Sequence, residues 1–443
     1  RQLAAVTPST RDRCIDLLRV ASLGTVVLGH WLMAAVTVDG EGNAQVGNLL
    51  AEVPALQPVT WLLQIMPVFF FVGGFSHALS YRSLRRKSEG GSVYAAFLRA
   101  RLQRLLRPTM VFIAVWGTAA LLMQLLGVDG PTARVAQRLV AQPLWFVGIS
   151  LGMVAFPPPL LRLHERFGAW ALGGLVAGAV AVDVLRFAAG VPYVEFLNFA
   201  FVWLAVHQLG FLRADGRLDR PAVPVAMAVT GLASAALLVA FGPYPLSMVG
   251  MPGEKVSNMA PPTLALLAHA IWLVGAVELV RRPAPRRLER QRVWQAVVAA
   301  NGIAMTAFLW HLTAMLAVVG IALAAGAPFP EPGSAGWWVQ APLRLGAAAV
   351  ITAVLVAFFR RFERPVTARA AGTAHRASGP TAALGVALCL LGVLGLSSVG
   401  FAGMLQGHSA TLIAFQVTAP AAVAMAVGGW ALVEVAGRGR GRR

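Results

Sequence analysis

The chain has 443 residues, of which 58% are hydrophobic and 12% are charged, with a mean hydropathy of +0.69. Soluble domains carry roughly 25% charged residues, so this composition excludes an ordinary water-soluble enzyme and a disordered or fibrous chain. A polytopic membrane protein remains. At about 20 residues for each helical span, the length allows about a dozen helices. We therefore expect the chemistry to take place in or beside a lipid bilayer.

The formal net charge of +19 has two explanations, a nucleic-acid partner or a membrane protein with a basic cytoplasmic side. Twelve apolar runs predict spans at 15–38, 59–80, 109–126, 143–160, 169–189, 196–212, 222–242, 262–280, 302–326, 339–359, 380–403 and 409–434. Arginines gather before the first span and after every even-numbered one, whereas 39–58 carries acids and no Lys or Arg. The charge therefore predicts two cytoplasmic termini and no nucleic-acid partner.

The first span carries Arg19 and His30, and ionisable groups inside a bilayer are costly enough to be functional candidates. Their spacing brings both side chains within about 20° of one helical face, with a rise of about 16 Å. Arg19 would lie near the cytoplasmic surface, where a guanidinium binds phosphate, and His30 in the outer half of the membrane. The alternative is a snorkelling arginine and a histidine that hydrogen-bonds inside the bundle.

A basic stretch separates the second span from the third and ends in "FLRARLQRLLRP" (97–108). If this stretch is helical, Arg101 and Arg104 are i, i+3 neighbours that can converge on phosphates, with Arg99 close by in sequence. The alternative is a set of solvated charges that only orient the chain in the membrane.

Three further residues are candidates for orienting a substrate. Trp145 lies in the fourth span, Asn258 in an outer connection (243–262) too rich in proline for a helix, and His311 in the ninth span. For Trp145 the alternative is an anchor at the membrane interface, and for His311 a satisfied core histidine. The two cysteines, Cys14 and Cys389, are far apart in apolar stretches, so we expect no disulfide framework and no metal site.

Eight motifs occur in order: "DLLRVASLGTVVLGHW" (16–31), "MPVFFFVGGFSHALSYRS" (66–83), "FLRARLQRLLRP" (97–108), "PLWFV" (143–147), "NFAFVWLAVHQLGFL" (198–212), "SNMAPPTLALLA" (257–268), "MTAFLWHLTA" (305–314) and "FERP" (362–365). The ordered set resembles the acyltransferase family 3 of membrane enzymes over residues 11–365. The chain departs from the family pattern at Gly73 and Gly74, where Ser-Gly is common, and at Phe308, where Tyr is common.

The resemblance implies an integral membrane O-acyltransferase in a plasma membrane, of the bacterial inner-membrane kind. It would bind no cofactor and would use acyl-CoA, most often acetyl-CoA, as co-substrate for a hydroxyl of a sugar, lipid-linked glycan or secondary metabolite. The resemblance makes His30 the catalytic histidine with Arg19 as its partner, and places Arg99, Arg101 and Arg104 in the basic loop that binds the donor. Histidine suits a general base for a hydroxyl, and a direct transfer and an acyl-imidazole intermediate both stay open.

These observations predict an all-α polytopic helical bundle. An acyltransferase domain of about ten helices would occupy residues 1–365, and two further helices with a basic tail would occupy 366–443. A transporter or flippase with buried His, Asp and Arg relay groups is the alternative from another class. The absence of a visible internal repeat counts against it.

Overall fold

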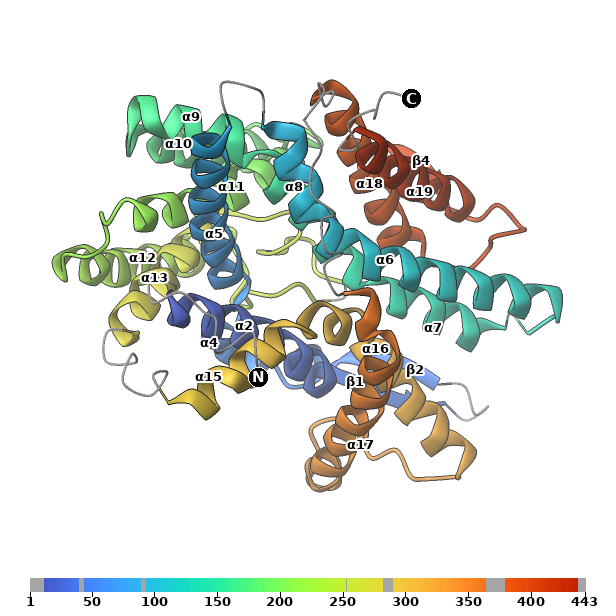
Figure 1. Ribbon diagram of the computed structural model, residues 1–443. Helices are drawn as coiled ribbons and strands as arrows, with labels where there is room; N and C mark the ends of the chain where they lie inside the picture. Colours follow the sequence, from blue (N-terminus) through green and yellow to red (C-terminus); the bar gives the residue numbers. More distant parts are fainter. Residues whose placement is uncertain are drawn as a thin grey trace, which may run out of the picture.

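The computed structural model describes residues 12–39, 44–88, 93–128, 130–251, 253–281, 290–363 and 379–436. Within them, eleven helical segments are long and apolar enough to cross a membrane, and Leu264–Val280 is a shorter apolar helix of 17 residues at the predicted eighth span. Every predicted span therefore coincides with a helix, and the prediction of an all-α polytopic bundle is confirmed (Figure 1). The orientation of the chain ends and the division at residue 365 stay predictions.

The elements, in chain order, are α2 (Arg13–Met33), β1 (Ala34–Val38), β2 (Ala44–Asn48), α3 (Leu49–Glu52), η1 (Pro54–Val59), α4 (Thr60–Leu63), α5 (Met66–Lys87), α6 (Tyr94–Leu125), α7 (Pro131–Ala141), α8 (Pro143–Ala155), α9 (Pro157–Phe167), α10 (Trp170–Phe187), η2 (Val194–Leu197), α11 (Asn198–Ala214), α12 (Ala222–Phe241), α13 (Leu264–Val280), α15 (Gln291–Asn301), α16 (Ala304–Ala324), α17 (Ala335–Phe359), η3 (Arg360–Phe362), α18 (Gly379–Val399), β3 (Ser409–Leu412), β4 (Phe415–Thr418) and α19 (Ala419–Ala436).

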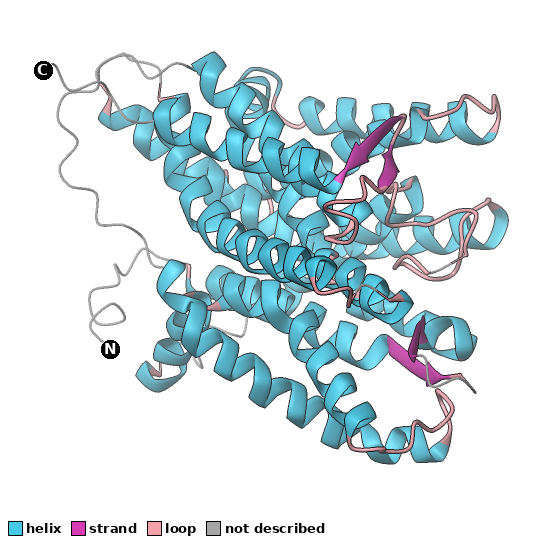
Figure 2. Cartoon of the chain, turned by 90° about the vertical axis from the view of Figure 1, so that its right-hand side faces the viewer, coloured by secondary structure: helices cyan, strands magenta, loops and turns pink. Residues whose placement is uncertain are grey.

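Two predicted spans are shorter than expected because their ends form hairpins. The first span stops at Met33, where β1 begins an antiparallel pair with β2, and the last begins at Ala419, after β3 and β4. Short apolar runs do not distinguish strand from helix by hydropathy alone. Figure 2 shows both hairpins at the same end of the helices, which we call the hairpin end.

Glycines allow α5 and α11 to pack with their backbones in close contact. A Cβ atom at Gly74 would collide with the carbonyl oxygen of His207, and one at Gly210 would collide with that of Phe71. Only glycine fits where two helix backbones approach this closely. The contact lies at Gly74, the glycine that the chain shares with the family's Ser-Gly pattern, whereas a Cβ atom at Gly73, where the chain departs from that pattern, would meet nothing within 4 Å.

Helices α18 and α19 pack against each other and against the rest of the bundle (Figure 1). Leu394 of α18 lies directly over Gly148 of α8. Glu434 of α19 pairs with Arg99 of α6 at 3.5 Å and accepts a hydrogen bond from Gln103 at 3.2 Å. The two helices beyond the family resemblance are therefore joined to the bundle by apolar and polar contacts. The predicted basic tail lies outside the described residues.

Candidate active site

His30 and His311 form a stacked pair between α2 and α16. Nδ1 of His30 lies 2.8 Å from Nε2 of His311, the ring centroids are 5.1 Å apart and the interplanar angle is 10°. The indole Nε1–H of Trp31 donates to the carbonyl oxygen of His311 at 2.9 Å, which fastens the same two helices together. Two of the sequence candidates thus meet although they lie 281 positions apart.

The hydrogen bonds of the pair determine which nitrogen of His30 can act on a substrate. Nδ1 of His311 contacts the carbonyl oxygen of Phe308, which can only accept, so this nitrogen carries a proton. In a neutral ring Nε2 of His311 is then an acceptor, and His30 must donate to it from Nδ1. The remaining nitrogen of His30, Nε2, therefore has a lone pair available to accept a proton.

His30 lines a cavity of about 500 Å³ that lies toward the hairpin end of the bundle. Its wall includes α2, the connection between β2 and α5, the start of α8, the loop before α13, and the ends of α17 and α18 that face the hairpins. The volume is in the range of pockets that bind small molecules. The cavity is therefore the space in which a substrate can reach His30.

The start of α16 is held by Glu363, which follows η3. Its carboxylate accepts hydrogen bonds from the backbone N–H groups of Met305 at 3.0 Å and Thr306 at 2.8 Å, and from the hydroxyl of Thr306 at 2.5 Å. A carboxylate at a helix N-terminus satisfies backbone donors and complements the helix dipole. Because His311 lies less than two turns further along α16, Glu363 contributes to the position of that ring.

The second sequence candidate in α2, Arg19, lies toward the end opposite the hairpins. Its Nη2 donates to the hydroxyl of Ser76 on α5 at 3.0 Å. Arg101 of α6 lies close enough to Arg19 and Arg104 to be repelled by both of their positive charges. The basic stretch is helical here, as the i, i+3 argument requires. Three guanidinium groups from two helices thus produce a concentration of positive charge suited to an anion.

Arg99 occupies a different side of α6. Its Nε lies 3.5 Å from a carboxylate oxygen of Glu434, so the side chain is directed toward α19. Arg101 and Arg104 are three positions apart and lie on one face of the helix. Arg99 and Arg101 are two positions apart, which separates them by about 200° around the helix axis. The ion pair with Glu434 therefore distinguishes Arg99 from the other two arginines.

The comparison with protein families gives one match, to a family model described as an acyltransferase domain, over residues 12–361. The chain belongs to this acyltransferase family. No curated protein and no solved structure matches the chain. The matched segment contains the histidine pair and the three arginines, and it ends before α18. The chain is therefore a membrane acyltransferase.

The other two candidates for orienting a substrate, Trp145 and Asn258, lie in different positions relative to the cavity. Trp145 lines the cavity beside His30. Asn258 is fully buried, and its Nδ2 donates to the carbonyl oxygens of Pro245 at 2.7 Å and Ser247 at 2.9 Å, while its Oδ1 accepts from the hydroxyl of Thr263 at 2.8 Å. These bonds fix the loop before α13, of which the next two residues line the cavity. Asn258 thus shapes the wall from behind.

A second histidine pair, which sequence reasoning did not join, connects α5 and α11. Nδ1 of His77 lies 3.0 Å from Nε2 of His207. His77 is also near enough to Arg19 and Arg101 to interact with their positive charges. No spacing rule links residues on helices 130 positions apart. The feature of the sequence that accompanies this pair is Gly74, the glycine at which the backbones of the two helices are in close contact.

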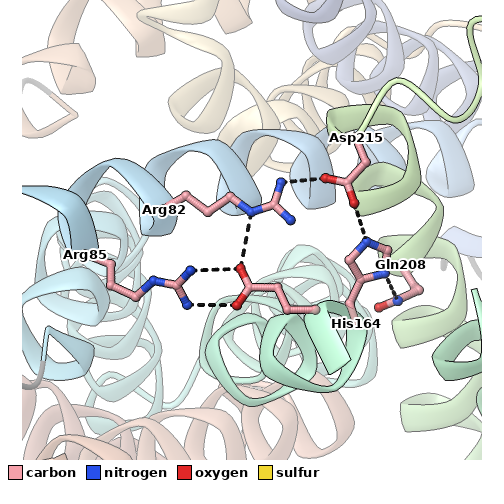
Figure 3. Close-up of polar contacts among 6 residues, drawn as sticks. Arg82, Arg85, His164, Gln208 and Asp215 are labelled. Atoms are coloured by element: carbon pink, nitrogen blue, oxygen red, sulfur yellow. Dashed lines mark hydrogen bonds and ion pairs between the residues drawn. The ribbon is translucent and has the colours of Figure 1, made fainter. Parts of the chain in front are cut away.

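A polar network joins α5, α9 and α11 (Figure 3). Arg82 pairs with Asp215 at 2.7 Å, and Arg85 donates two hydrogen bonds to Glu165 at 2.9 and 3.0 Å. Buried His164 lies between Asp215, at 2.8 Å from Nε2, and Gln208, at 2.6 Å from Nδ1 (Figure 3). The network fixes the ends of three helices relative to one another.

Among the described ranges, no group of three His, Cys, Asp or Glu side chains is arranged to hold a metal ion. The two cysteines are buried and separate.

Proposed function

We propose that the acyltransferase moves an acyl group, acetyl in the simplest case, from acyl-CoA to a hydroxyl of an acceptor, with His30 as general base. The observation that carries this proposal is the histidine pair, because His311 holds His30 in the tautomer with a lone pair on Nε2. A hydroxyl has a pKa far above 7, so its attack on a thioester needs a base on its proton.

In the proposed step, the acceptor oxygen forms a bond to the thioester carbonyl carbon while its proton passes to Nε2 of His30. The carbon–sulfur bond then breaks, and the CoA sulfur leaves with the proton that His30 returns. His30 ends neutral, the acceptor is an ester and CoA is a thiol. An acyl-imidazole on His30 is a second route with the same products.

Arg19, Arg101 and Arg104 are the proposed binding site for the CoA phosphates. Guanidinium groups bind phosphate with two parallel hydrogen bonds, and three of them acting on one region suit a polyanion. Arg19 and His30 lie on one helix with a rise of about 16 Å between them, which an extended pantetheine arm can cover. The donor would approach from the end opposite the hairpins, which we propose is cytoplasmic in a plasma membrane.

The test compares cells that produce the wild-type chain with cells that produce His30→Ala. Mass spectrometry of their lipids, glycans and secreted metabolites should show an added acyl mass that only the wild type produces. His408→Ala is the matched control, because His408 is exposed in the connection between α18 and β3. An acyl product that persists in His30→Ala would refute the assignment of His30.

A further inference from the structure

The wall of the cavity beside His30 is mainly apolar. Leu49, Leu50, Leu63, Trp145 and Phe146 are among its lining residues. A hydroxyl acceptor that reaches His30 must place the rest of its structure against these side chains. The apolar character of the wall therefore indicates which kind of acceptor can bind.

We propose that the acceptor is an amphipathic alcohol, a molecule whose hydroxyl meets His30 while an attached hydrocarbon portion fills this cavity. This inference rests on the proposed function and narrows its acceptor class. Free sugars and polysaccharides without a lipid portion are outside the class, whereas long-chain alcohols, terpenoid alcohols and glycolipids are inside it.

Most polar side chains of the wall are already engaged within the protein. The hydroxyl of Thr60 donates to Gln57 at 2.6 Å and accepts from the backbone of Met248 at 2.9 Å. Gln64 donates to the carbonyl oxygen of Met248 at 3.0 Å and accepts from Met66 at 3.4 Å. A free sugar would have few partners for its hydroxyl groups, and each one buried without a partner weakens binding by roughly 10-fold to 100-fold.

Helix α18 supplies part of the same wall through Ser397 and Ser398. Both hydroxyls donate to the carbonyl oxygen of Leu394, at 2.8 and 3.0 Å, so their protons are engaged within the helix. This helix lies beyond the segment that matches the acyltransferase family, which ends at residue 361. The acceptor class would thus depend in part on a helix outside the family domain.

The position of the cavity separates it from the proposed binding site for the CoA portion of the donor. The proposed donor site at Arg19 lies toward the end opposite the hairpins, and the cavity extends from His30 toward the hairpin end. A donor and an acceptor that react at His30 must approach from different sides. The cavity is on the side that the CoA portion does not occupy.

The first experiment measures acyl transfer by the full chain in a detergent without hydroxyl groups, with labelled acetyl-CoA as donor. The acceptors are 1-butanol, 1-octanol, 1-dodecanol, octyl glucoside and glucose. We expect esters of the long alcohols and of octyl glucoside, with kcat/KM rising about fourfold for each added CH2 until the cavity is full. Glucose as good an acceptor as octyl glucoside would overturn the inference.

The second experiment narrows the cavity with Ser398→Leu and uses Leu391→Phe as control, because Leu391 is on the same helix and 43% exposed. The narrowed variant should prefer shorter alcohols and keep the wild-type preference for acyl length, and the control should behave as wild type. A changed preference for acyl length with an unchanged preference for alcohol would assign the cavity to the acyl chain and refute the inference.

A third measurement separates this inference from the proposed function, because it needs no turnover. A photoactivatable dodecanol, used without acyl-CoA, should label peptides that contain Trp145 or Ser398, and 1-octanol should compete while glucose should not. Labelling of these peptides without any transfer would refute the role of His30 and retain the cavity. Transfer without labelling there would retain the function and refute the cavity as the acceptor site.

Discussion

Nδ1 of His30 lies 2.8 Å from Nε2 of His311, and Nδ1 of His311 in turn contacts the carbonyl oxygen of Phe308. This series of contacts resembles the base, orienting group and anchor of hydrolases, in which the orienting group fixes the tautomer of the reactive histidine. Here a second imidazole fills the place that a carboxylate occupies there. It orients His30 without bringing a negative charge into the membrane, where a charge is costly.

Replacing His30 with Ala should reduce acyl transfer by roughly 10²-fold to 10⁴-fold, because a general base in the transition state contributes about that factor. The measurement is initial rate with labelled acetyl-CoA on purified protein, with size-exclusion profiles to show that folding is retained. His408→Ala should keep the wild-type rate. A His30→Ala rate close to wild type would remove this residue from the mechanism.

In the proposed mechanism His311 acts through His30, so its variants should separate orientation from chemistry. His311→Gln provides an amide oxygen that can accept from Nδ1 of His30 and should retain activity within about tenfold, whereas His311→Leu should lower kcat by roughly 10-fold to 100-fold. KM for acyl-CoA should be unchanged in both, because the proposed phosphate contacts are elsewhere. Equal losses for Gln and Leu would point to a purely structural or a directly reacting His311.

The sequence predicts the helices better than it predicts the site. The spans follow from hydropathy because the bilayer requires long apolar helices, and one spacing rule places Arg19 and His30 on a single helix. Contacts between distant helices have no such rule. The position of Ser76 against Arg19 and the cap that Glu363 forms on α16 depend on how the helices pack.

The six residues from Arg99 to Arg104 show the same limit of sequence-based prediction. The family resemblance places Arg99, Arg101 and Arg104 together in the basic loop that binds the donor. The structure separates them because Glu434, from a helix more than 300 positions further along, pairs with Arg99. Sequence spacing gave no reason to connect α6 with α19.

Neutralising Arg101 and Arg104 together, as Gln, should weaken binding of a non-hydrolysable acyl-CoA analogue by about tenfold or more at low salt, because charge-assisted phosphate contacts are lost. The loss should shrink as salt rises, since screening already weakens the wild-type contacts. Arg99→Gln is the matched control and should bind the analogue as wild type does, with lower thermal stability. Equal affinity for all three proteins would remove the proposed donor site.

The predicted orientation can be tested with single cysteines, because Cys14 and Cys389 are buried and give little background labelling. A membrane-impermeant maleimide added to intact cells should label Glu331→Cys, in the loop before α17, and should leave Ser88→Cys, at the end of α5, unlabelled until the cells are opened. The reverse pattern would invert the protein and place the donor arginines outside.

The network of Figure 3 should make folding stability depend on pH in the acid range. The hydrogen bonds from Arg85 lower the pKa of Glu165. Burial raises the pKa of Asp215, but hydrogen bonds from Arg82 and His164 outweigh it, so this pKa is also lower than usual. A carboxylate with a lowered folded pKa stabilises the protein fully above its unfolded pKa of about 4, and this stabilisation is lost as the pH falls through the folded value.

Glu165→Gln should therefore lower the Tm at pH 7 by about 1–2 °C, a small effect because the ion pair is partly exposed and surface pairs contribute about 1 kcal/mol or less. The difference from wild type should decrease as the pH is lowered from 6 toward 3, because wild-type Glu165 itself becomes neutral there. Glu331→Gln is the control, since Glu331 is exposed in a loop, and its Tm should follow the wild type throughout. The measurement is thermal unfolding of the purified protein across this pH series. A difference that grows on acidification would contradict the lowered pKa of Glu165.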